Sequence, residues 1–468
     1  MGPLLSPRGR CGLRQRGSLP LLSGLALINF INNHREDKSM KNIIQPVKGT
    51  RDFYPAEKAV IAWLWSTIRE VSESFGYQEF DGPYLESIDL YAAKSGEELV
   101  KEQSFVFPDK NGNLIALRPE LTPSLVRMIA QKQQQLFYPL RWWSFGPFWR
   151  YESPQKGRGR EFFQWNADLI GVDSPEADAE LTALLASLFQ KVGLGPDQVK
   201  VFVNNRRLME NELAELGIPE DLQGSVFRVI DRRDKLSDSD WKGYALKMGL
   251  SESQFSGIQA LLSADDLWKK SPELPHFFEA ADALGVAEYV AYSPRVIRGL
   301  DYYTGTVFEA QAISSKVRRS IAGGGRYDNL LADVGGQPLS GVGFALGDMV
   351  LSVILDELDL LPLNRDASPA QVMVTVFDED SQLAAYQLSA ELRKAGIPVY
   401  TYPTPDKLGK QFKHADRIGT RVAVILGPDE IREKKVAIKD LSTREQFTFP
   451  REDAPKAILG LLENDPSA

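Results

Sequence analysis

Apolar side chains three and four residues apart form the first clear pattern in the chain, over residues 58–75. This spacing predicts an amphipathic helix that ends at Gly76. Two stretches rich in aromatic and branched side chains follow, at 136–149 and 162–170, on either side of a polar loop at 152–161. Such stretches favour strands, so we expect a long antiparallel hairpin.

Helical spacing returns at 176–191 and again from about 207 to 286, where charges are frequent and strand patterns are nearly absent. The second of these stretches predicts a helical module inserted into the body of the protein. Strand patterns resume at 296–309 and at 342–345. The body is therefore expected to be α+β, with an antiparallel sheet.

A linker is predicted at 361–369, where the composition changes. Beyond it, strand patterns at 372–377, 399–402 and 421–426 alternate with helical patterns at 381–395 and 408–418. Alternation of this kind predicts a small α/β domain with a largely parallel sheet. We expect four parts: an N-terminal extension at 1–39, an α+β body at 40–366, its helical insertion at about 207–286, and an α/β domain at 369–468.

Residues 1–39 differ from the rest, because no acidic residue precedes Glu36 and several arginines stand before the apolar stretch 19–31. A signal peptide or an organellar transit peptide would share these features. The apolar stretch is broken at Ser23, has no small-residue cleavage site after it, and is shorter than the ~20 residues that span a bilayer. We favour a mis-assigned start, with Met40 as the true first residue, and expect no membrane association.

The composition restricts the chemistry. The 468 residues carry a net charge of −8, so nucleic-acid contacts must come from local basic patches. A single cysteine, Cys11, and three scattered histidines exclude intramolecular disulfides, a His/Cys zinc site of the usual spacing, and Ser–His or Cys–His catalysis. A reducing compartment, the cytoplasm, fits this composition. Any chemistry must rest on Arg, Glu, Asp, Gln and Tyr.

The predicted hairpin carries a concentration of positive charge. Arg150 stands at the end of a predicted strand, which would fix its guanidinium for bidentate binding of phosphate oxygens. The loop after it adds Lys156, Arg158 and Arg160, with glycines that permit close approach to an anion. An exposed hairpin with solvated charges is the competing interpretation.

A second candidate tract is RGLDYYTGTVFE, residues 298–309. If it forms a strand, Arg298 and its alternate residues share one face. Tyr302 and Tyr303, beside an arginine and an aspartate, would make a polar, aromatic surface suited to a small planar ligand. The alternative is an amphipathic strand that packs its tyrosine rings into a core.

The glycine run 323–325 would let the backbone come close to a ligand or to another strand. A flexible turn is the competing interpretation. The run lacks the glycine spacing of a dinucleotide fold and the Gly-Lys-Ser/Thr of a P-loop, so neither of those phosphate sites applies.

Glu120 and Thr122 place a carboxylate and a hydroxyl two residues apart in a proline-bounded stretch. A carboxylate is what a ligand ammonium group requires. The alternative is a helix start that Thr122 caps.

A basic stripe is predicted near the end of the chain, because cations recur there at steps of three or four residues with Asp416 as the only acid within the run. It consists of Lys407, Lys410, Lys413, Arg417 and Arg421. A phosphate backbone would bind such a stripe. A solvated helix face is the alternative.

Together these tracts resemble one family, the histidyl-tRNA synthetases, in order from about residue 43 to 446. The opening tract 49–53 resembles the start of the family. Residues 76–83 and 148–168 are similar to motifs 1 and 2 of class II synthetases, and motif 1 forms the dimer interface in that class. RGLDYYTGTVFE is similar to the tract peculiar to histidine enzymes, and LGKQFKHADRIG with VAVILGPDEI resembles the anticodon-binding domain.

The resemblance implies a class II antiparallel-sheet core and a homodimer that joins L-histidine to tRNA(His), with ATP and Mg²⁺. It implies that Arg150 and Arg298 hold the α-phosphate and stabilise the transition state. The implied ATP-binding residues are Arg150, Glu152, Arg158 and Phe162, which stacks on adenine. The implied histidine-binding residues are Glu120, Thr122, Arg150, Gln164, Asp168, Arg298, Tyr302 and Tyr303. The implied tRNA-binding residues are Gln155, Lys407, Lys410, Lys413 and Arg417.

Two positions depart from the family pattern. Val350 stands where class II motif 3 carries an arginine that covers adenine and the γ-phosphate, so either ATP is bound differently or another arginine substitutes. Ser153 stands where members often have an arginine linked to reading the extra 5′ guanosine of histidine tRNA, while Gln155 remains.

Two rival functions are weighed on the same tracts. A regulatory subunit of ATP phosphoribosyltransferase, which binds histidine without aminoacylation, tends to lose the RGLDYY tract and the C-terminal domain, and both are present. A tRNA-binding or kinase-regulating module on a decayed synthetase body would predict losses at Arg150 or Arg298, and neither is lost.

Overall fold

The structure is a computed structural model that describes residues 43–92, 103–297, 302–314, 320–332, 335–362, 368 and 370–463. It divides into two compact units, Met1–Asp52 with Trp65–Leu361, and Phe53–Leu64 with Pro362–Ala468. No helix among the described residues is long and apolar enough to cross a membrane. Each unit is described by itself below.

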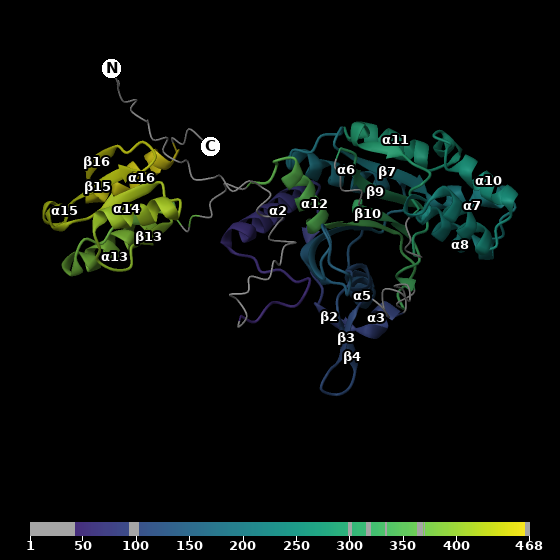
Figure 1. Cartoon of the computed structure of the whole chain (residues 1–468), viewed down its shortest axis with the longest axis horizontal. Coiled ribbons are helices and arrows are strands. Elements are labelled where there is room, and N and C mark those ends of the chain that lie inside the picture. The colour runs from purple at the N-terminus through teal and green to yellow at the C-terminus, as the bar shows by residue number, and fades with distance from the viewer. Residues whose placement is uncertain are drawn as a thin grey trace, which may run out of the picture. The chain divides into compact units, whose positions relative to one another are not determined.

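An eight-stranded sheet forms the centre of the larger unit (Figure 1). Its strands, in spatial order, are β1 (Gln78–Glu79), β5 (Leu140–Trp149), β6 (Glu161–Ile170), β11 (Gly341–Gly347), β10 (Ser320–Tyr327), β9 (Thr306–Ala312), β7 (Val199–Asn205) and β8 (Val290–Tyr292). Neighbours from β5 to β7 are antiparallel, and only the outer pairs β1–β5 and β7–β8 are parallel. The expected α+β fold with an antiparallel sheet is confirmed.

The predicted hairpin is confirmed as β5 and β6, whose register runs from Leu140 opposite Ile170 to Trp149 opposite Glu161. Its first strand begins at Leu140, four residues later than predicted, and a 3-10 turn at Gln133–Gln135 precedes it. Aromatic and branched side chains on both strands favour this extended, paired backbone.

The glycine run lies within β10, so the flexible-turn interpretation is wrong. A Cβ atom on Gly324 would lie 2.3 Å from the carbonyl oxygen of Gly343 in the next strand. One on Gly325 would lie 2.8 Å from the Tyr303 ring. The glycines therefore give room for a neighbouring backbone and an aromatic ring.

The predicted strand over 296–309 is wrong in its first part. The described residues 302–305 form a turn and β9 begins only at Thr306, while 298–301 lie outside the described residues. The turn lets Tyr302 and Tyr303 lie side by side with ring centroids 4.9 Å apart, whereas strand neighbours would point to opposite faces.

Two helices cover one face of the sheet. Helix α6 (Pro175–Lys191) begins where predicted, capped by Ser174, and packs on β6, β7, β9 and β11. Helix α11 (Leu274–Ala283) lies along α6 (Figure 1). Almost every apolar side chain of α6 is buried, as expected of a helix held between a sheet and a second helix.

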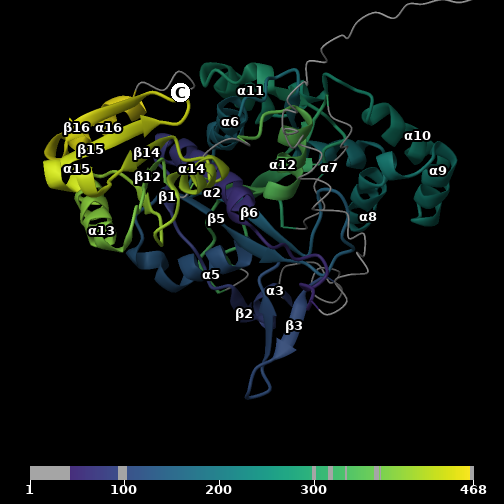
Figure 2. The same ribbon diagram turned by 60° about the vertical axis from the view of Figure 1, so that its left-hand side comes forward.

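Between β7 and α11 the chain forms four further helices, which Figures 1 and 2 show gathered together at one end of the larger unit. They are α7 (Arg206–Glu215), α8 (Glu220–Asp231), α9 (Asp238–Lys247) and α10 (Glu252–Leu261), with short 3-10 turns at Arg233–Lys235 and Leu267–Lys270. We call these four helices the helical module. Their own apolar residues form its core, among them Val226, Trp241, Phe255 and Ile258.

A small three-stranded sheet lies beside the large one, with β4 (Leu114–Leu117) between β2 (Leu85–Ser87) and β3 (Phe105–Pro108). The short helix α3 (Ile88–Ala92) and helix α5 (Thr122–Lys132) adjoin it. Leu121 precedes α5 and no side chain caps it, so the prediction that Thr122 caps this helix is wrong. Thr122 is instead the first helical residue, which leaves its hydroxyl available to other groups. Helix α12 (Asp348–Glu357) follows β11, and α2 (Pro55–Ser74) confirms the first predicted helix.

The second unit contains a five-stranded sheet in the order β13 (Val399–Thr401), β12 (Val372–Val374), β14 (Val422–Ile425), β15 (Lys435–Asp440) and β16 (Gln446–Pro450). The first three strands are parallel, as predicted, and β15 and β16 add an antiparallel edge that the patterns did not predict. The helices are α13 (Glu379–Lys394), α14 (Leu408–Arg417), α15 (Pro428–Glu433) and α16 (Ala454–Glu463). Branched side chains from all three parallel strands fill its core.

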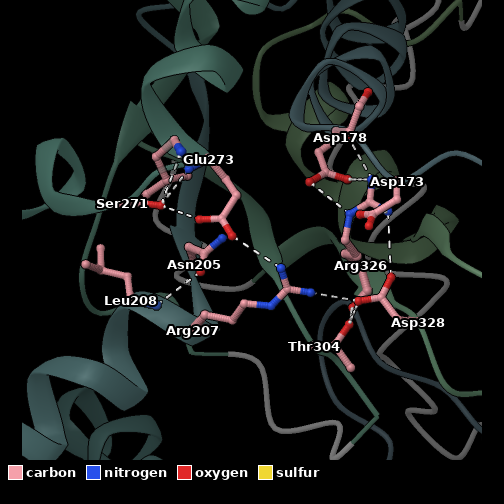
Figure 3. Close-up of polar contacts among 12 residues, drawn as sticks. Asp173, Asp178, Asn205, Arg207, Leu208, Ser271, Glu273, Thr304, Arg326 and Asp328 are labelled. Carbon is pink, nitrogen blue, oxygen red and sulfur yellow. Dashed lines mark hydrogen bonds and ion pairs between the residues drawn. The ribbon is translucent and has the colours of Figure 1, made fainter.

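Arg326 in β10 ties the large sheet to α6. Its guanidinium pairs with Asp178 through two contacts, 2.6 Å from Nη2 to Oδ1 and 3.3 Å from Nε to Oδ2 (Figure 3). The same group donates to the carbonyl oxygens of Val172 and Ser174, each at 2.9 Å. The side chains of Arg326 and Asp178 are only 4% and 2% exposed, so the charges depend on each other.

We expect Arg326→Ala to lower the free energy of unfolding by about 3–5 kcal/mol, because it leaves the Asp178 carboxylate buried and unpaired. Denaturant unfolding measures this. The matched control is Arg69→Ala, which breaks the exposed pair with Glu73 and should cost about 0.5 kcal/mol or less. Equal, small losses in both variants would contradict the assigned role of Arg326.

Candidate active site

The predicted ligand-binding residues of β6 share one face of the large sheet. Phe162, Gln164 and Asp168 stand at alternate positions of β6, so their side chains point to the same side. Glycines stand opposite two of them: Gly146 and Gly347 flank Gln164, and Gly343 flanks Asp168. A Cβ atom on Gly343 would lie 2.0 Å from Oδ1 of Asp168. The missing side chains therefore create the room that this carboxylate occupies.

Asp168 is a buried carboxylic acid with one strong donor. Its side chain accepts a hydrogen bond of 2.6 Å from the Tyr327 hydroxyl, and the residue is 4% exposed. Burial raises the pKa of Asp168 to about 7, although the Tyr327 hydrogen bond acts in the opposite direction. The carboxyl group is thus poised between its two charge states near neutral pH, as binding groups in clefts often are. The sequence pattern predicted no role for Tyr327, which is marked only by its place just after the glycine run.

Three tyrosine rings gather beside Asp168. The rings of Tyr302 and Tyr327 meet edge to face at 6.1 Å, and burial raises the pKa of Tyr302 well above its ordinary value. Tyr303 is buried against Gly325 within a hydrophobic cluster, as the core-packing alternative predicted for these rings. Tyr302 is only half-buried. The result is an aromatic wall with hydroxyl groups next to a carboxyl group.

Arg150 leaves the end of β5 and lies between two other segments. Its Nε donates to the Pro119 carbonyl oxygen at 2.9 Å, and its guanidinium carbon is 5.3 Å from the centre of the Phe162 ring. Burial lowers the pKa of Arg150, while the carboxylates of Glu120 and Glu152 raise it. An arginine remains protonated in such a setting. The side chain is thus a fixed positive charge between the Pro119–Glu120 segment and the Phe162 ring.

The loop 152–160 is ordered by contacts and is not a freely solvated hairpin end. Arg158 pairs with Glu152, and the backbones of Gln155 and Arg158 exchange hydrogen bonds of 3.0 and 2.8 Å. Lys156 reaches Glu357 of α12 at 2.7 Å. The Arg158 side chain is still 50% exposed, so a ligand could reach its guanidinium.

Helix α12 begins at a buried carboxylate that joins three segments. Asp348 is fully buried and accepts hydrogen bonds of 2.8 Å from the backbone N–H of Phe163 and of 2.8 Å from Arg51. Arg51 belongs to the opening tract 49–53, and our reading of the sequence gave it no role. Its only signal was membership of that tract.

Comparison with known proteins identifies the chain's relatives. Residues 49–349 match the family model described as histidyl-tRNA synthetase, and residues 371–461 match that of the anticodon binding domain. The chain belongs to the histidyl-tRNA synthetase family. The "Histidine--tRNA ligase" of Leptospira biflexa is 35% identical over 90% of this chain and 98% of its own length. The "Histidine--tRNA ligase, chloroplastic/mitochondrial" of Arabidopsis thaliana is 37% identical over 89% of this chain and 87% of its own.

Solved structures agree on the fold. The histidyl-tRNA synthetase from Nostoc sp. superposes with a TM-score of 0.76 at 27% identity, covering 90% of this chain and 99% of that one. A structure titled ATP phosphoribosyltransferase regulatory subunit/histidyl-tRNA synthetase, from Bacillus halodurans, gives a TM-score of 0.66 at 22% identity, over 79% and 96% of the two chains. The second likeness shows the shared fold alone.

Val350, one of the two positions that depart from the synthetase family pattern, lies against the ordered loop. A Cβ atom on Gly157, whose φ is +73°, would be 3.5 Å from Cγ2 of Val350. Val350 therefore presents an apolar surface to the loop that carries Arg158. Arg298, the other residue expected at the phosphates, lies outside the described residues.

The expected basic stripe is shorter than predicted. Lys410, Lys413 and Arg417 are exposed on α14, and Lys407 immediately precedes the helix. Arg421 lies beyond the end of α14 at Arg417, and its Nε is 3.5 Å from Asp440, so its inclusion in the helical stripe was wrong. Lys410 is opposed by Asp406 at 2.6 Å, an acid outside the run that defined the stripe.

The raised pKa of Asp168 has a measurable consequence for stability. In the folded protein the pKa of this carboxyl is about 7, whereas the pKa of an aspartate in the unfolded chain is about 4. Folding thus favours the protonated form, and the free energy of unfolding falls as pH rises through this window.

We therefore expect Asp168→Asn, without histidine present, to be more stable than the natural protein at pH 8, by about 1–4 kcal/mol. The difference should shrink towards pH 4, because both side chains are then neutral. Urea unfolding at several pH values measures it. Parallel stability curves for the two proteins between pH 5 and pH 8 would show that burial does not perturb this group.

Proposed function

We propose that the protein is a histidine–tRNA ligase, which converts ATP, L-histidine and tRNA(His) to histidyl-tRNA(His), AMP and diphosphate through a histidyl-adenylate. The observation that carries the proposal is the shared face of β6, which has Asp168 beside Tyr302 and Tyr327 towards one end and Phe162 next to Arg150 towards the other. The carboxyl group of Asp168 and the neighbouring tyrosines suit a small polar ring, whereas the Phe162 ring and the Arg150 guanidinium suit a nucleotide. Relatives named histidine–tRNA ligases support the same reaction over nearly the whole chain.

In the ATP half of the site, Phe162 stacks on adenine while Glu152 and Arg158 line the nucleotide. Arg150 holds the α-phosphate together with Arg298. A carboxylate oxygen of histidine attacks the α-phosphorus, the bond to diphosphate breaks, and diphosphate leaves. Fixed guanidinium groups stabilise the added negative charge of the transition state without moving. Positioning and charge carry this step, so it needs no histidine or cysteine nucleophile.

In the amino-acid half, Asp168, Glu120, Thr122 and Gln164 hold the histidine, with carboxylates facing its ammonium group. Glu120 and Gln164 are 7% and 8% exposed, and Gln164 Oε1 is a buried acceptor with no hydrogen-bond partner among the described residues. Tyr302 and Tyr303 lie against the imidazole, and Arg150 and Arg298 adjoin the histidine carboxylate. Buried polar groups reject an analogue that leaves them unpaired, which gives selectivity that an apolar pocket lacks.

Mg²⁺ enters this proposal with ATP. The ion commonly binds phosphates and one or two carboxylates, and Glu152 in the nucleotide loop fits such a role. Among the described residues, no cluster of three or more His, Cys, Asp or Glu side chains could hold a metal by itself. The phosphates of ATP would supply most of the Mg²⁺ ligands.

The remaining parts of the proposal concern assembly. We propose a homodimer through the tract 76–83, a catalytic domain at 40–366 with its insertion at about 207–286, and an anticodon-binding domain at 369–468. Gln155, Lys407, Lys410, Lys413 and Arg417 contact tRNA(His). The chain works in the cytoplasm, where its single cysteine needs no partner.

The proposal is tested by ATP–pyrophosphate exchange with each of the twenty amino acids. We expect exchange with histidine alone. Arg150→Gln should lower the exchange rate by about 10²-fold or more, because it removes both the positive charge and the bidentate guanidinium group. Arg432→Gln, at an exposed pair with Asp429, is the control and should behave as the natural protein. Absence of exchange with any amino acid, combined with tight histidine binding, would instead favour the regulatory subunit of ATP phosphoribosyltransferase.

For the tRNA step, we expect Lys413→Ala with Arg417→Ala to raise the KM for tRNA(His) while pyrophosphate exchange stays unchanged. Removal of two phosphate contacts should also reduce the salt dependence of tRNA binding by a slope of about 2. Filter binding at several salt concentrations measures that slope. An unchanged slope would assign these residues to a solvated helix face.

A further inference from the structure

The helical module is fastened at the point where the chain enters and leaves it. Asn205 ends β7 and caps α7, with its Oδ1 accepting from the Leu208 N–H at 3.1 Å. Glu273 stands just before α11, after the module has returned to the body, and Ser271 donates to it at 2.8 Å. Nη1 of Arg207 reaches Oε1 of Glu273 at 3.2 Å (Figure 3). One guanidinium therefore joins both ends of the module.

The same guanidinium continues into the catalytic body. Nη2 of Arg207 lies 3.0 Å from Oδ2 of Asp328, the residue directly after β10 (Figure 3). That Oδ2 also accepts a hydrogen bond of 2.6 Å from the Thr304 hydroxyl, and Oδ1 accepts one of 2.6 Å from Ser340. Asp328 thus holds three segments: the start of the module, the turn before β9, and the segment leading into β11.

Thr304 is the link to the amino-acid pocket. It follows Tyr302 and Tyr303 directly, and its backbone N–H donates to the Arg326 carbonyl at 2.8 Å. Next to it, the Gly305 carbonyl accepts from the N–H of Arg206, the first residue of α7, at 2.9 Å. The turn that carries the tyrosines is therefore bonded both to Asp328 and to the helical module.

We propose that Arg207 is a positioning residue, through which the helical module fixes the Tyr302–Thr304 turn and so sets the affinity for histidine. The inference rests on the proposed function, and Arg207 itself lies outside the predicted site. A shift of the module moves Arg207, and Oδ2 of Asp328, which also accepts from Thr304, then loses its cationic partner, while Oδ1 keeps Ser340 and, at 3.8 Å, Arg326. The tyrosine rings follow, because they stand directly before Thr304 in the same turn.

The size of the expected effects separates positioning from structural support. The Arg207 side chain is 47% exposed, and exposed ion pairs contribute little to stability. Loss of this pair should therefore leave folding nearly intact. Small displacements in a binding site change affinity more than they change stability, and couplings of this kind typically alter affinity by about three- to tenfold.

The experiment compares Arg207→Ala, Arg207→Lys and the natural protein. We expect the histidine Kd from calorimetry to rise about three- to tenfold in Arg207→Ala, while the KM for ATP in pyrophosphate exchange changes less than about twofold. Arg207→Lys should recover part of the affinity, because an ammonium group can meet one carboxylate but not bridge two. Lys235→Ala is the matched control, since it breaks an exposed pair with Asp231 in the same module and should leave both constants unchanged.

A double-variant cycle tests the route through Asp328. If Arg207 acts through Asp328, Asp328→Asn combined with Arg207→Ala should weaken histidine binding no more than the stronger single variant. Additive losses would overturn the route. If Asp328→Asn does not fold, the two Arg207 variants still decide.

Two results would overturn the inference itself: an unchanged histidine Kd in Arg207→Ala, or equal weakening of histidine and ATP. Both results count only if the natural protein catalyses histidine-dependent pyrophosphate exchange. Failure of that exchange in the natural protein would overturn the proposed function instead, so the two failures are distinguishable.

Discussion

The carboxyl group of Asp168 can be buried only because Gly343 has no side chain and Tyr327 supplies a donor. Both conditions depend on the pairing of β10 with β11 and of β11 with β6. A shift of one residue in either pairing would turn Tyr327 or Gly343 to the opposite face of the sheet. The register of the central strands is therefore the constraint on which the candidate site depends.

That register is fixed from the other side of the sheet. Arg326 and Tyr327 are adjacent in β10, so their side chains point to opposite faces. Tyr327 reaches Asp168, whereas Arg326 pairs with Asp178 of α6. A slip of β10 would bury an unpaired guanidinium, which costs several kcal/mol, about as much as a small domain's whole margin of stability. The Arg326–Asp178 ion pair thus helps to fix the position of Tyr327 beside Asp168, although the pair lies on the opposite face of the sheet.

Periodicity in the sequence was sufficient for the elements that bury one regular face. The β5–β6 hairpin, α6 and the parallel strands of the second unit follow from local patterns of apolar residues. The tract 298–309 was harder to predict. Two adjacent tyrosines are typical of a strand, whereas in the structure a turn brings their rings together. Tyr327, Arg51 and Arg326 meet partners 159, 297 and 148 residues away, and no local pattern encodes such distances. The family resemblance supplied the candidate residues, whereas their supporting residues became apparent only in three dimensions.

Val350, which departs from the family pattern, lies beside the loop 152–160. An arginine at that position would place a charge beside the loop, whereas valine places a methyl group there, 3.5 Å from where a Cβ atom on Gly157 would stand. Meanwhile Lys156 pairs with Glu357 and Arg51 pairs with the buried Asp348, so both ends of α12 are joined by ion pairs to neighbouring segments. Fixed contacts of this kind reduce the ordering that ATP must impose when it binds. Arg158 is an exposed guanidinium on this ordered loop, an arrangement that favours binding of a phosphate.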